Sequence, residues 1–484
     1  MDQFCLLKYE DAEVSIPLFD EKLRPKGPSV SVMIGANGSG KSRYLSRMVD
    51  ELSYLNERRI GKTSSQIRPK GPSEGATIEY RIDGMHCSIK RDQNELKCAV
   101  NDSYADFHEM PFPRRVAAVA YLPSDRFRFS RNVGDSFYRY LGIRQATNLT
   151  TTGALETRVL ESLIIGLSQR RFSEQLLRWL SLAGMSPDVS IAITLADEAL
   201  ITDDFEEFRK TAFELAVRRA GPGRRDQFQH DLRLPNDIDA FWSLMSQLRA
   251  FNWMSNDKYP SVTIDLGRAA GELADARTWI DGLEAARRWR FLRGSSLLLG
   301  KKNGRFPFSE MSSGEQQLIG MNVRILSELE HDALVVIDEP EISLHPAWQI
   351  KYVPTLLQCL AENPSTHIII ATHSHFVVSD LDSEQSALIV ASNEDGPKFE
   401  LFDGDVYGRS PENILYRVFG VATTGNSYVE GDLYDALTMI SSRKKIDREK
   451  LIKIYTRLQR VSGRDNPAMN TILEKISYVI NRSV

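Results

Sequence analysis

Short apolar runs separated by polar turns fill the first 126 residues of the chain. The run SVSVMIG (29–35) leads into a glycine-rich loop and predicts a strand that is buried on both faces. RYLSRMVDELSYL (43–55) then carries apolar residues at helical spacing. Antiparallel strands separated by polar turns are predicted by TIEYRIDG, MHCSIK and ELKCAV, and another buried strand by VAAVAYL (116–122).

From about residue 127 to residue 300 the pattern changes to long helical segments, with two candidate strands, IAITL and SVTIDL. Strand character returns at residue 297, and the later runs LVVIDEPE, HIIIATHSH and ALIVAS predict further strands. The order predicts an α/β fold: a P-loop domain in two halves (1–126 and 301–400) with an antiparallel β-subdomain. A mainly helical insertion (127–300) and a helical C-terminal region (401–484) complete the expected organisation.

Residues 35–42 read GANGSGKS and fit the pattern G-x-x-x-x-G-K-[ST] between a strand and a helix. Such a loop wraps a phosphate with its backbone N–H groups at a helix N-terminus. Lys41 is expected to reach the phosphates of ATP, and Ser42 to hold Mg²⁺. The alternative is a glycine-rich turn beside an exposed lysine. The expected ATP-binding residues are Gly35, Asn37, Gly38, Ser39, Gly40, Lys41 and Ser42.

LVVIDEP (334–340) predicts a buried strand with two carboxylates at its C-terminal tip, where open α/β sheets place ligands. Asp338 is suited to Mg²⁺, together with Ser42. Glu339 is expected to be catalytic by polarising the water that attacks the γ-phosphate. A solvated acidic strand end is the alternative. The P-loop and this strand are nearly 300 residues apart, which indicates a large insertion.

MSSGEQQ (311–317) looks like the ABC signature in the form that SMC-like and RecF-like ATPases use, and ATHS (371–374) looks like their H-loop. EISLHP (341–346) stands where those families carry the D-loop. The resemblance to these ABC-type, AAA-family ATPases implies that His373 is catalytic and contacts the γ-phosphate in cis; a satisfied histidine at a strand end is the alternative. It also implies a homodimer or higher homo-oligomer. Four signature residues would then act in trans on a partner subunit's ATP: Ser312, Ser313, Gly314 and Glu315.

The chain departs from the ABC pattern in two places. ABC ATPases carry a glutamine after the strand that here is VAAVAYL, but this chain reads PSDR (123–126). Asp125 or Ser124 could replace the glutamine, and an ordinary turn is equally open. No residue is clearly placed to stack on adenine, and Tyr9 and Phe19 are the aromatic candidates.

IDEPEISLHPAWQ together with ATHSHFVVSDL resembles the overcoming-lysogenization-defect-like ATPases of anti-phage defence. The ATPase subunit of Septu-type systems, which works beside a separate HNH nuclease, is the favoured match, and that of PARIS-type systems is the alternative. The resemblance implies an ATP-hydrolysing regulatory subunit that controls an HNH-type nuclease or another effector. Two other functions stay open: an ATP-locked scaffold with negligible turnover, and a RecF/SMC-like DNA-repair ATPase, which the lack of a long heptad repeat disfavours.

An intrinsic nuclease is not expected. Val429-Glu430-Gly431-Asp432 and Asp403-Gly404-Asp405 superficially resemble the two acidic motifs of a TOPRIM domain. Their order is reversed, however, and the sequence around Glu430 is helical in pattern. Turn and helix-cap acids are the simpler interpretation.

Charge changes this picture only in the insertion. The 484 residues carry a net charge of −4, which excludes a uniformly basic polymer-binding protein. Residues 127–300 hold 21 Arg, 2 Lys and 22 acidic residues, which suits DNA contact or ion pairs. Four cysteines without a CxxC pair, no long apolar run and no signal-peptide pattern predict a cytoplasmic protein without membrane contact.

Overall fold

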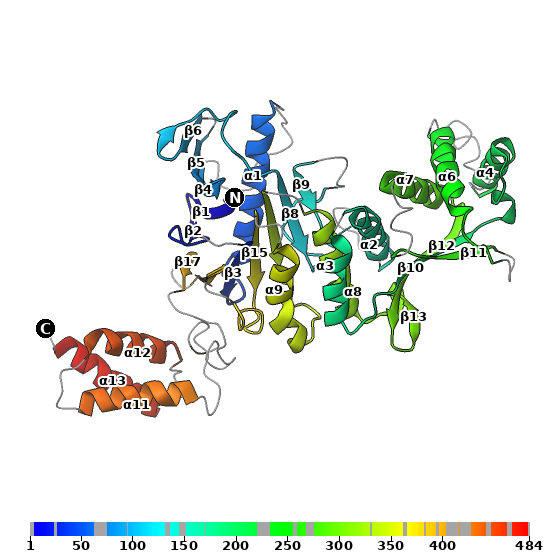
Figure 1. The fold of residues 1–484 in the computed structure, drawn as a ribbon. Coiled ribbons are helices and arrows are strands. Elements are labelled where there is room, and N and C mark those ends of the chain that lie inside the picture. The colour runs from blue at the N-terminus through cyan, green and yellow to red at the C-terminus, as the bar shows by residue number, and fades with distance from the viewer. Residues whose placement is uncertain are drawn as a thin grey trace.

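The computed structural model describes residues 4–23, 27–61, 75–93, 95–130, 136–144, 152–169, 171–219, 233–254, 259–267, 275–329, 332–361, 365–381, 384–393, 396–402, 416, 427–441, 447–461 and 467–482. Within these ranges no helix has both the length and the apolar character that crossing a membrane requires. Figure 1 shows the arrangement of the helices and strands.

A seven-stranded sheet in the order β17-β16-β3-β15-β14-β8-β9 forms the centre of the molecule, and only β17 runs antiparallel to its neighbour. Its strands are β3 (Ser29–Gly35), β8 (Arg115–Ala120), β9 (Tyr138–Tyr140), β14 (Ala333–Asp338), β15 (Thr366–Thr372), β16 (Ser386–Ser392) and β17 (Lys398–Leu401). Every residue of β3, β8, β14 and β15 is buried, as expected for parallel strands covered on both faces.

The sheet interleaves segments that are far apart in the sequence. In its register Ile34 lies opposite Thr372, and Ala120 lies opposite Asp338. The C-terminal ends of β3, β8, β14 and β15 therefore meet at one edge of the sheet. This is the edge where open α/β sheets bind their ligands.

A second sheet is antiparallel, as TIEYRIDG, MHCSIK and ELKCAV predict, and has the order β2-β1-β4-β5-β6-β7. Its strands are β1 (Cys5–Asp11), β2 (Ser15–Pro17), β4 (Ala76–Ile82), β5 (Met85–Asp92), β6 (Glu95–Val100) and β7 (Ser103–Tyr104). Helix α1 (Lys41–Arg59) contributes Leu45, Met48 and Leu52 to a core that it shares with both sheets. This core holds the P-loop helix against the central sheet.

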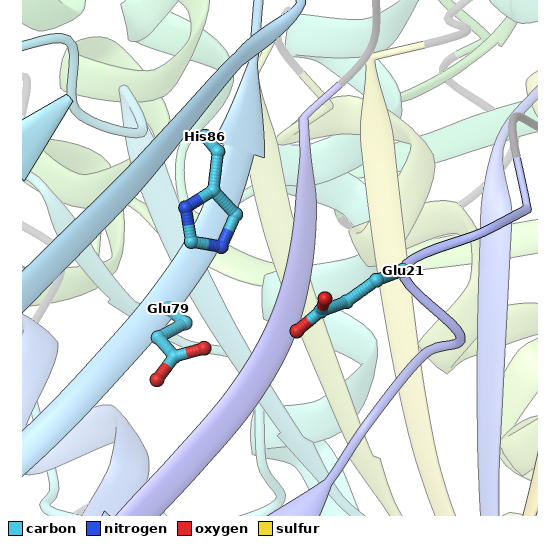
Figure 2. Close-up of side chains that lie close together, drawn as sticks. All are labelled: Glu21, Glu79 and His86. Carbon is cyan, nitrogen blue, oxygen red and sulfur yellow. The ribbon is translucent and has the colours of Figure 1, made fainter. Parts of the chain in front are cut away.

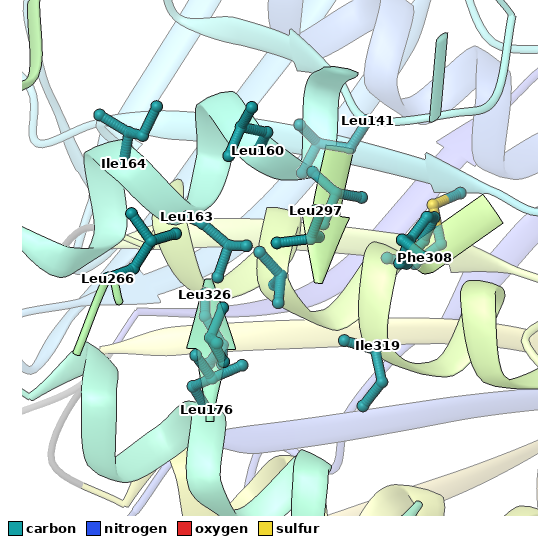
Figure 3. Packing of buried hydrophobic residues seen from close by; sticks show 14 of the residues in the cluster. Leu141, Leu160, Leu163, Ile164, Leu176, Leu266, Leu297, Phe308, Ile319 and Leu326 are labelled. Carbon is teal, nitrogen blue, oxygen red and sulfur yellow. The ribbon is translucent and has the colours of Figure 1, made fainter. Parts of the chain in front are cut away.

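The other face of the central sheet carries α8 (Ser313–Ser327) and α9 (Pro346–Leu360), with the short helix η3 (Phe308–Glu310) before α8. Helices α2 (Thr152–Leu167) and α3 (Phe172–Leu182) of the inserted segment pack on α8 in the same core. In Figure 3, Leu163 of α2 lies near Leu326 of α8. The insertion is thus built directly onto the helix that begins at the predicted signature.

The rest of the insertion combines helices with a small antiparallel sheet in the order β11-β10-β12-β13. The strands are β10 (Val189–Leu195), β11 (Ser261–Asp265), β12 (Leu292–Lys301) and β13 (Gly304–Pro307), so IAITL and SVTIDL do form strands. The helices are η1 (Glu198–Leu200), α4 (Phe205–Arg219), α6 (Leu234–Leu248) and α7 (Ala276–Arg288). They lie beside this small sheet, away from the central sheet (Figure 1).

Three C-terminal helices, α11 (Ser427–Ser441), α12 (Arg448–Val461) and α13 (Pro467–Arg482), form a core of their own. Ala436, Leu451, Ile454, Leu458 and Ile476 are buried in it. The helical character predicted for this region is therefore present. The domain limits at residues 126, 300 and 400 remain predictions.

Candidate functional site

The P-loop leaves β3 at Gly35 and ends where α1 begins at Lys41. Gly38 and Gly40 have φ angles of 81° and 93°, a region that glycine enters without a steric penalty. The loop therefore wraps around the N-terminus of a 19-residue helix, where backbone N–H groups and the helix dipole favour an anion.

Lys41 is buried inside this loop. Its Nζ donates to the carbonyl oxygen of Gly35 at 2.9 Å and lies 3.1 Å from Nε2 of His373. Burial lowers the pKa of Lys41 to about 8, against the opposing charges of the nearby carboxylates. The lysine is thus held at the floor of the loop by neutral acceptors that phosphate oxygens can replace.

Ser42 and Asp338 meet as the sequence predicted. The Ser42 hydroxyl donates to Oδ1 of Asp338 at 2.8 Å. Burial, with the charges of Glu339 and Glu341, raises the pKa of Asp338 to about 7. Three neighbouring carboxylates beside a hydroxyl form a set of hard oxygen donors, so these residues fit Mg²⁺, with Ser42 and Asp338 as its protein ligands.

Glu339 and His373 face each other across the same site. Oε1 of Glu339 is 3.5 Å from Nε2 of His373. Burial and the ammonium of Lys41 lower the pKa of His373, so the imidazole is neutral and can accept from Lys41. Glu339 has a φ of 53°, and its N–H donates to the carbonyl oxygen of Ala371 at 2.8 Å. The backbone of Glu339 is thus held in the left-handed region, which residues other than glycine rarely adopt.

A cleft of about 1,100 Å³ joins these groups, close to the size range of ligand sites in proteins. Eight of the expected residues line it: Asn37, Gly38, Ser39, Gly40, Lys41, Ser42, Glu339 and His373. The expected residues Gly35 and Asp338 are not among its lining residues. A recess of about 170 Å³ beside it is lined by Ser42, Asp338 and Glu339. Segments that are 300 residues apart thus form one concave site.

Several other residues also line the cleft. Glu341 and Ile342 belong to the predicted D-loop and Arg126 to the PSDR segment, but the sequence assigned these three no role in the site. It did not single out the others: Glu13, Arg43, Tyr44, Asn393 and Pro397. Arg43 and Tyr44 directly follow the P-loop, so their position was a usable signal. Glu13 accepts from Arg43 at 2.9 Å and from Arg47 at 3.0 Å. No local pattern connects Glu13 or Asn393 with a P-loop, because both arrive through the fold of distant segments.

The predicted signature is at the N-terminus of α8. Ser312 caps this helix, and its hydroxyl and backbone form a capping box with Glu315. Lys301 donates to Oε1 of Glu315 at 2.7 Å. Among the described residues that line the cleft, none comes from residues 312–315. The structure thus brings Gly35–Ser42, Asp338, Glu339 and His373 together and leaves Ser312, Ser313, Gly314 and Glu315 outside that group.

The D-loop segment contacts the signature within the chain. A Cβ on Gly314 would meet the carbonyl oxygen of Ser343 at 2.4 Å, so only glycine allows this approach. Glu341 lies at the other end of the segment, where its Oε1 accepts from the N–H of His373 at 2.6 Å. The segment between Glu341 and Ser343 therefore touches both the H-loop and the signature helix.

The structure bears on two questions that the sequence left open: which residue stacks on adenine, and which one stands in for the ABC glutamine. Tyr9 and Phe19 are only 1% and 2% exposed, so neither can stack on adenine, and that candidacy was wrong. Tyr44 is the aromatic residue that lines the cleft. Ser124 and Asp125, the two candidates for the missing glutamine, both line the recess beside Ser42 and Asp338. The Asp125 carboxylate is bound to Arg144 at 2.6 Å and to the Tyr140 hydroxyl at 2.6 Å. A role of either residue in place of the glutamine stays a prediction.

Many arginines of the insertion form ion pairs inside the chain. Arg288 pairs with Asp237 at 2.7 Å, Arg249 with Asp203 at 2.8 Å, and Arg287 lies 3.5 Å from Glu161. Another pair of adjacent arginines in the insertion, Arg224 and Arg225, lies outside the described residues. The ion-pair interpretation of the arginine bias is thus realised at several positions.

Figure 2 shows the one group of metal-ligating side chains that the described residues bring together away from the cleft: Glu21, Glu79 and His86. Glu79 and His86 project from β4 and β5. Lys8 lies close enough for Glu79 and Glu21 to raise its pKa, after the larger effect of its hydrogen bond with Glu10. The Lys8 ammonium therefore already supplies a positive charge beside this surface group.

The residues of the TOPRIM-like motif have other surroundings. Glu430 lies on helix α11, not on a strand. Asp432 accepts from the Tyr416 hydroxyl at 2.7 Å and pairs with Arg457 at 2.8 Å. Asp403 and Asp405 lie outside the described residues.

Residues 172–379 match the family described as "AAA domain, putative AbiEii toxin, Type IV TA system". This range includes the signature, the strand that ends at Asp338, and His373. Residues 172–379 of the chain are thus similar to an AAA-type ATPase domain. ATPase domains of this kind bind nucleotide and generally hydrolyse it.

Two curated relatives match part of the chain. The Septu protein PtuA of Bacillus thuringiensis is 26% identical over 194 residues, which cover 35% of this chain and 46% of that protein. The retron Ec83 probable ATPase of Escherichia coli is 27% identical over 137 residues, which cover 26% and 24%. The chain thus spans less than half the length of these relatives. They confirm its resemblance to ATPases of anti-phage defence systems.

Solved structures that match about four fifths of the chain include SMC head domains. The SmcHead bound to the C-winged helix domain of ScpA is 12% identical with a TM-score of 0.32, covering 82% of this chain and 97% of that one. The SMC head domain from Thermotoga maritima is 11% identical with a TM-score of 0.33, covering 83% and 100%. The α/β P-loop fold rests on the strand order described above.

Proposed function

We propose that the chain binds ATP in the cleft at the P-loop and hydrolyses it with Mg²⁺. The observation that carries this proposal is the convergence of Lys41, Ser42, Asp338, Glu339 and His373, from three distant segments, on one site. Such a set supplies a phosphate cradle, a metal site and a carboxylate for water. A glycine-rich turn or an isolated acidic strand end would not need this convergence.

Each side chain has a separate task. The P-loop N–H groups and Lys41 bind the phosphates, Ser42 and Asp338 would hold Mg²⁺, and Glu339 orients the attacking water. His373 lies beside Lys41 and Glu339, where it can contact the γ-phosphate. Mg²⁺, when bound, would neutralise phosphate charge and thereby assist departure of the leaving group.

Phosphate release from ATP by the purified chain tests this proposal. We expect release in the presence of Mg²⁺ and none after the metal is removed with EDTA. Tight ATP binding and ATP-dependent assembly without phosphate release would favour the ATP-locked scaffold instead. Failure to bind ATP at all would refute both.

We also propose that two chains pair head to head, so that Ser312, Ser313, Gly314 and Glu315 of one subunit complete the ATP site of the other. Ser312 and Ser313 are exposed at the start of α8 and outside the chain's own cleft, which supports a role in trans. The N-terminus of α8 offers a second positive dipole end to phosphate.

Mixing two inactive variants tests the pairing. A Lys41→Ala chain lacks a working P-loop, and a Ser312→Arg chain lacks a working signature. A heterodimer of the two retains up to one site with both parts intact, so hydrolysis should return on mixing. Mixed dimers that form and still do not hydrolyse ATP would contradict the composite site.

The proposed biological role is that of a cytoplasmic regulatory subunit of an anti-phage defence complex, acting on a separate HNH-type nuclease or another effector. The relatedness to PtuA and to the retron ATPase supports it. The purified chain should leave plasmid DNA intact with Mg²⁺ or Mn²⁺, and cleavage should require a second protein. Cutting that is lost in Glu430→Ala but kept in Lys41→Ala would point to an intrinsic nuclease.

DNA contact through the insertion is the weaker part of this proposal. The intrachain ion pairs of Arg249, Arg287 and Arg288 already account for several of its charges. A RecF/SMC-like repair ATPase would depend on such contact. Salt-sensitive DNA binding that is lost with the arginines of α7 would favour that alternative.

A further inference from the structure

Arg126 stands in the segment where ABC ATPases carry their glutamine. It is exposed, and it lines both the nucleotide cleft and the recess formed by Ser42, Asp338 and Glu339. The recess is the part of the site that faces the metal ligand and the water-orienting carboxylate. A cation at this position adjoins the region of the γ-phosphate.

The backbone of Arg126 is fixed on both sides. The Ser46 hydroxyl of α1 donates to the Arg126 carbonyl oxygen at 2.7 Å. The preceding residue, Asp125, accepts from the N–H of Phe127 at 2.9 Å and from two nitrogens of Arg144 at 2.6 and 2.8 Å. Arg144 also donates to the carbonyl oxygen of Phe127. The backbone of Arg126 is thus fixed to α1, and its neighbours Asp125 and Phe127 are fixed to Arg144, which follows β9. The Arg126 side chain itself is exposed.

The other arginines near the P-loop have different surroundings. Arg43 and Arg47 pair with Glu13, and Arg47 also pairs with Asp11 at 3.1 Å. Arg126 lines a cavity of about 510 Å³ together with Arg43 and Arg47. Of these three arginines, Arg126 is the one that also lines the recess with Asp338 and Glu339. An arginine can bind phosphate oxygens through two parallel N–H groups, which a neutral glutamine cannot match.

We propose that Arg126 is a catalytic residue that contacts the γ-phosphate of ATP in place of the missing glutamine. The Asp125–Arg144 pair acts as its positioning element. This inference rests on the proposed ATP site and adds a group that distinguishes ATP from ADP. The P-loop binds the phosphates that both nucleotides share, whereas Arg126 recognises the one that only ATP carries.

Equilibrium binding of ATP and of ADP, each with Mg²⁺, tests the proposal without requiring turnover. Arg126→Ala should weaken ATP binding about 10- to 100-fold, the value of a hydrogen bond to a charged group, and leave ADP binding unchanged. Arg126→Lys keeps the positive charge but lacks the two parallel N–H donors. Its ATP affinity should therefore lie between those of the wild type and Arg126→Ala. Arg128→Ala is the matched control, because Arg128 lies over the Tyr138 ring and is not among the cleft residues.

The binding measurements distinguish a failure of the proposed ATP site from a failure of the role proposed for Arg126. A wild-type chain that binds neither nucleotide refutes the ATP site itself. A wild-type chain that prefers ATP, with an Arg126→Ala variant that keeps this preference, refutes only the role of Arg126. Equal weakening of ATP and ADP by Arg126→Ala, or an equal effect of Arg128→Ala, also overturns it.

The positioning role has its own test. Asp125→Asn leaves Arg126 in place but weakens the bidentate pair with Arg144, so the preference for ATP should fall by a smaller factor than in Arg126→Ala. Glu51→Gln is the control, because Glu51 and Arg91 form a similarly buried bidentate pair away from the cleft. Thermal unfolding of both variants reports any common loss of stability. An ATP preference that changes equally in both variants, or in neither, contradicts the positioning role.

Discussion

The P-loop side of the nucleotide machinery and its signature side differ in how far one chain completes them. Lys41, Asp338 and His373 come from distant segments and still form one cleft. Ser312 and Ser313 are much closer to Asp338 in the sequence, yet they lie exposed at the start of α8, outside the cleft. Proximity along the chain therefore does not decide which motifs share a site. The parallel sheet decides it, because it collects strand ends at one edge.

The largest expected effect concerns the cleft side alone. Lys41→Ala removes the only side-chain cation of the P-loop, so ATP affinity should fall by at least about 100-fold. Binding of labelled ATP measures it. Arg58→Ala, at the far end of the same helix, should bind ATP like the wild type. Undiminished binding by Lys41→Ala would remove the basis for the cleft assignment.

A second substitution separates binding from turnover within the cleft. Glu339→Gln preserves the metal ligand Asp338 but removes the carboxylate that orients water. Hydrolysis should fall by about 100-fold or more, in the range of general acid–base contributions, while ATP binding persists. Steady-state phosphate release and equilibrium binding together measure this. Equal hydrolysis by the variant and the wild type would remove Glu339 from its assigned role.

Gly314→Ala tests the close contact between the start of α8 and the D-loop segment, which connects the signature side to the cleft side. The new Cβ would lie 2.4 Å from the Ser343 carbonyl oxygen, a backbone atom, so α8 or the D-loop segment must shift. We expect a loss of about 1–3 kcal/mol in the free energy of unfolding, as for other overpacked sites, together with slower hydrolysis. Gly431→Ala on α11 is the control, because a Cβ there meets no atom within 4 Å. Urea unfolding compares the two variants. Equal stability of Gly314→Ala and Gly431→Ala would contradict the close contact between Gly314 and Ser343.

The smallest expected effect is the dependence of folding stability on pH in the core beneath the P-loop side. His367 is fully buried on β15; its Nδ1 accepts from the N–H of Leu6 at 3.0 Å, and its Nε2 lies 2.8 Å from the Ser31 hydroxyl. Burial lowers its pKa to about 3 from an ordinary value of 6.5. Only the unfolded chain takes up this proton between those values, so stability should be lost as pH falls through that window. The loss at pH 5 is about 2 kcal/mol.

Urea midpoints at pH 7.5 and pH 5 measure this loss. His367→Asn keeps an acceptor for Leu6 but cannot be protonated, so its midpoint should differ less between the two pH values than that of the wild type. His108→Asn, at an exposed histidine, should keep the wild-type difference. An unchanged pH dependence in His367→Asn would contradict the assignment.

The sequence predicted the parts of the site whose chemistry is local. A strand, a glycine-rich loop and a helix in succession suffice to place Lys41 and Ser42, and a buried strand with two acids at its tip suffices for Asp338 and Glu339. Tyr9 was misjudged because a strand pattern does not say which face meets the core. Phe19 follows β2 and packs into a small core with Cys5, Leu7 and Ala387, which no local pattern indicates. The sequence located the PSDR segment of Arg126 but named Asp125 and Ser124 as its candidates, because it does not show which side chain lines the recess. Glu13 was missed because its place depends on how a separate segment folds back onto α1.

The interleaved order of the central sheet also bears on synthesis of the chain. The two neighbours of β3 are β15, which begins about 330 residues after the P-loop strand, and β16, which begins about 350 residues after it. At translation rates of roughly 5–20 residues per second, β3 waits roughly 20 to 70 s for its first hydrogen-bonding partner. All seven of its residues are buried in the finished sheet, so they form an apolar, unpaired edge during that time. We expect nascent chains that stop before residue 366 to aggregate, or to be held by chaperones, through this strand.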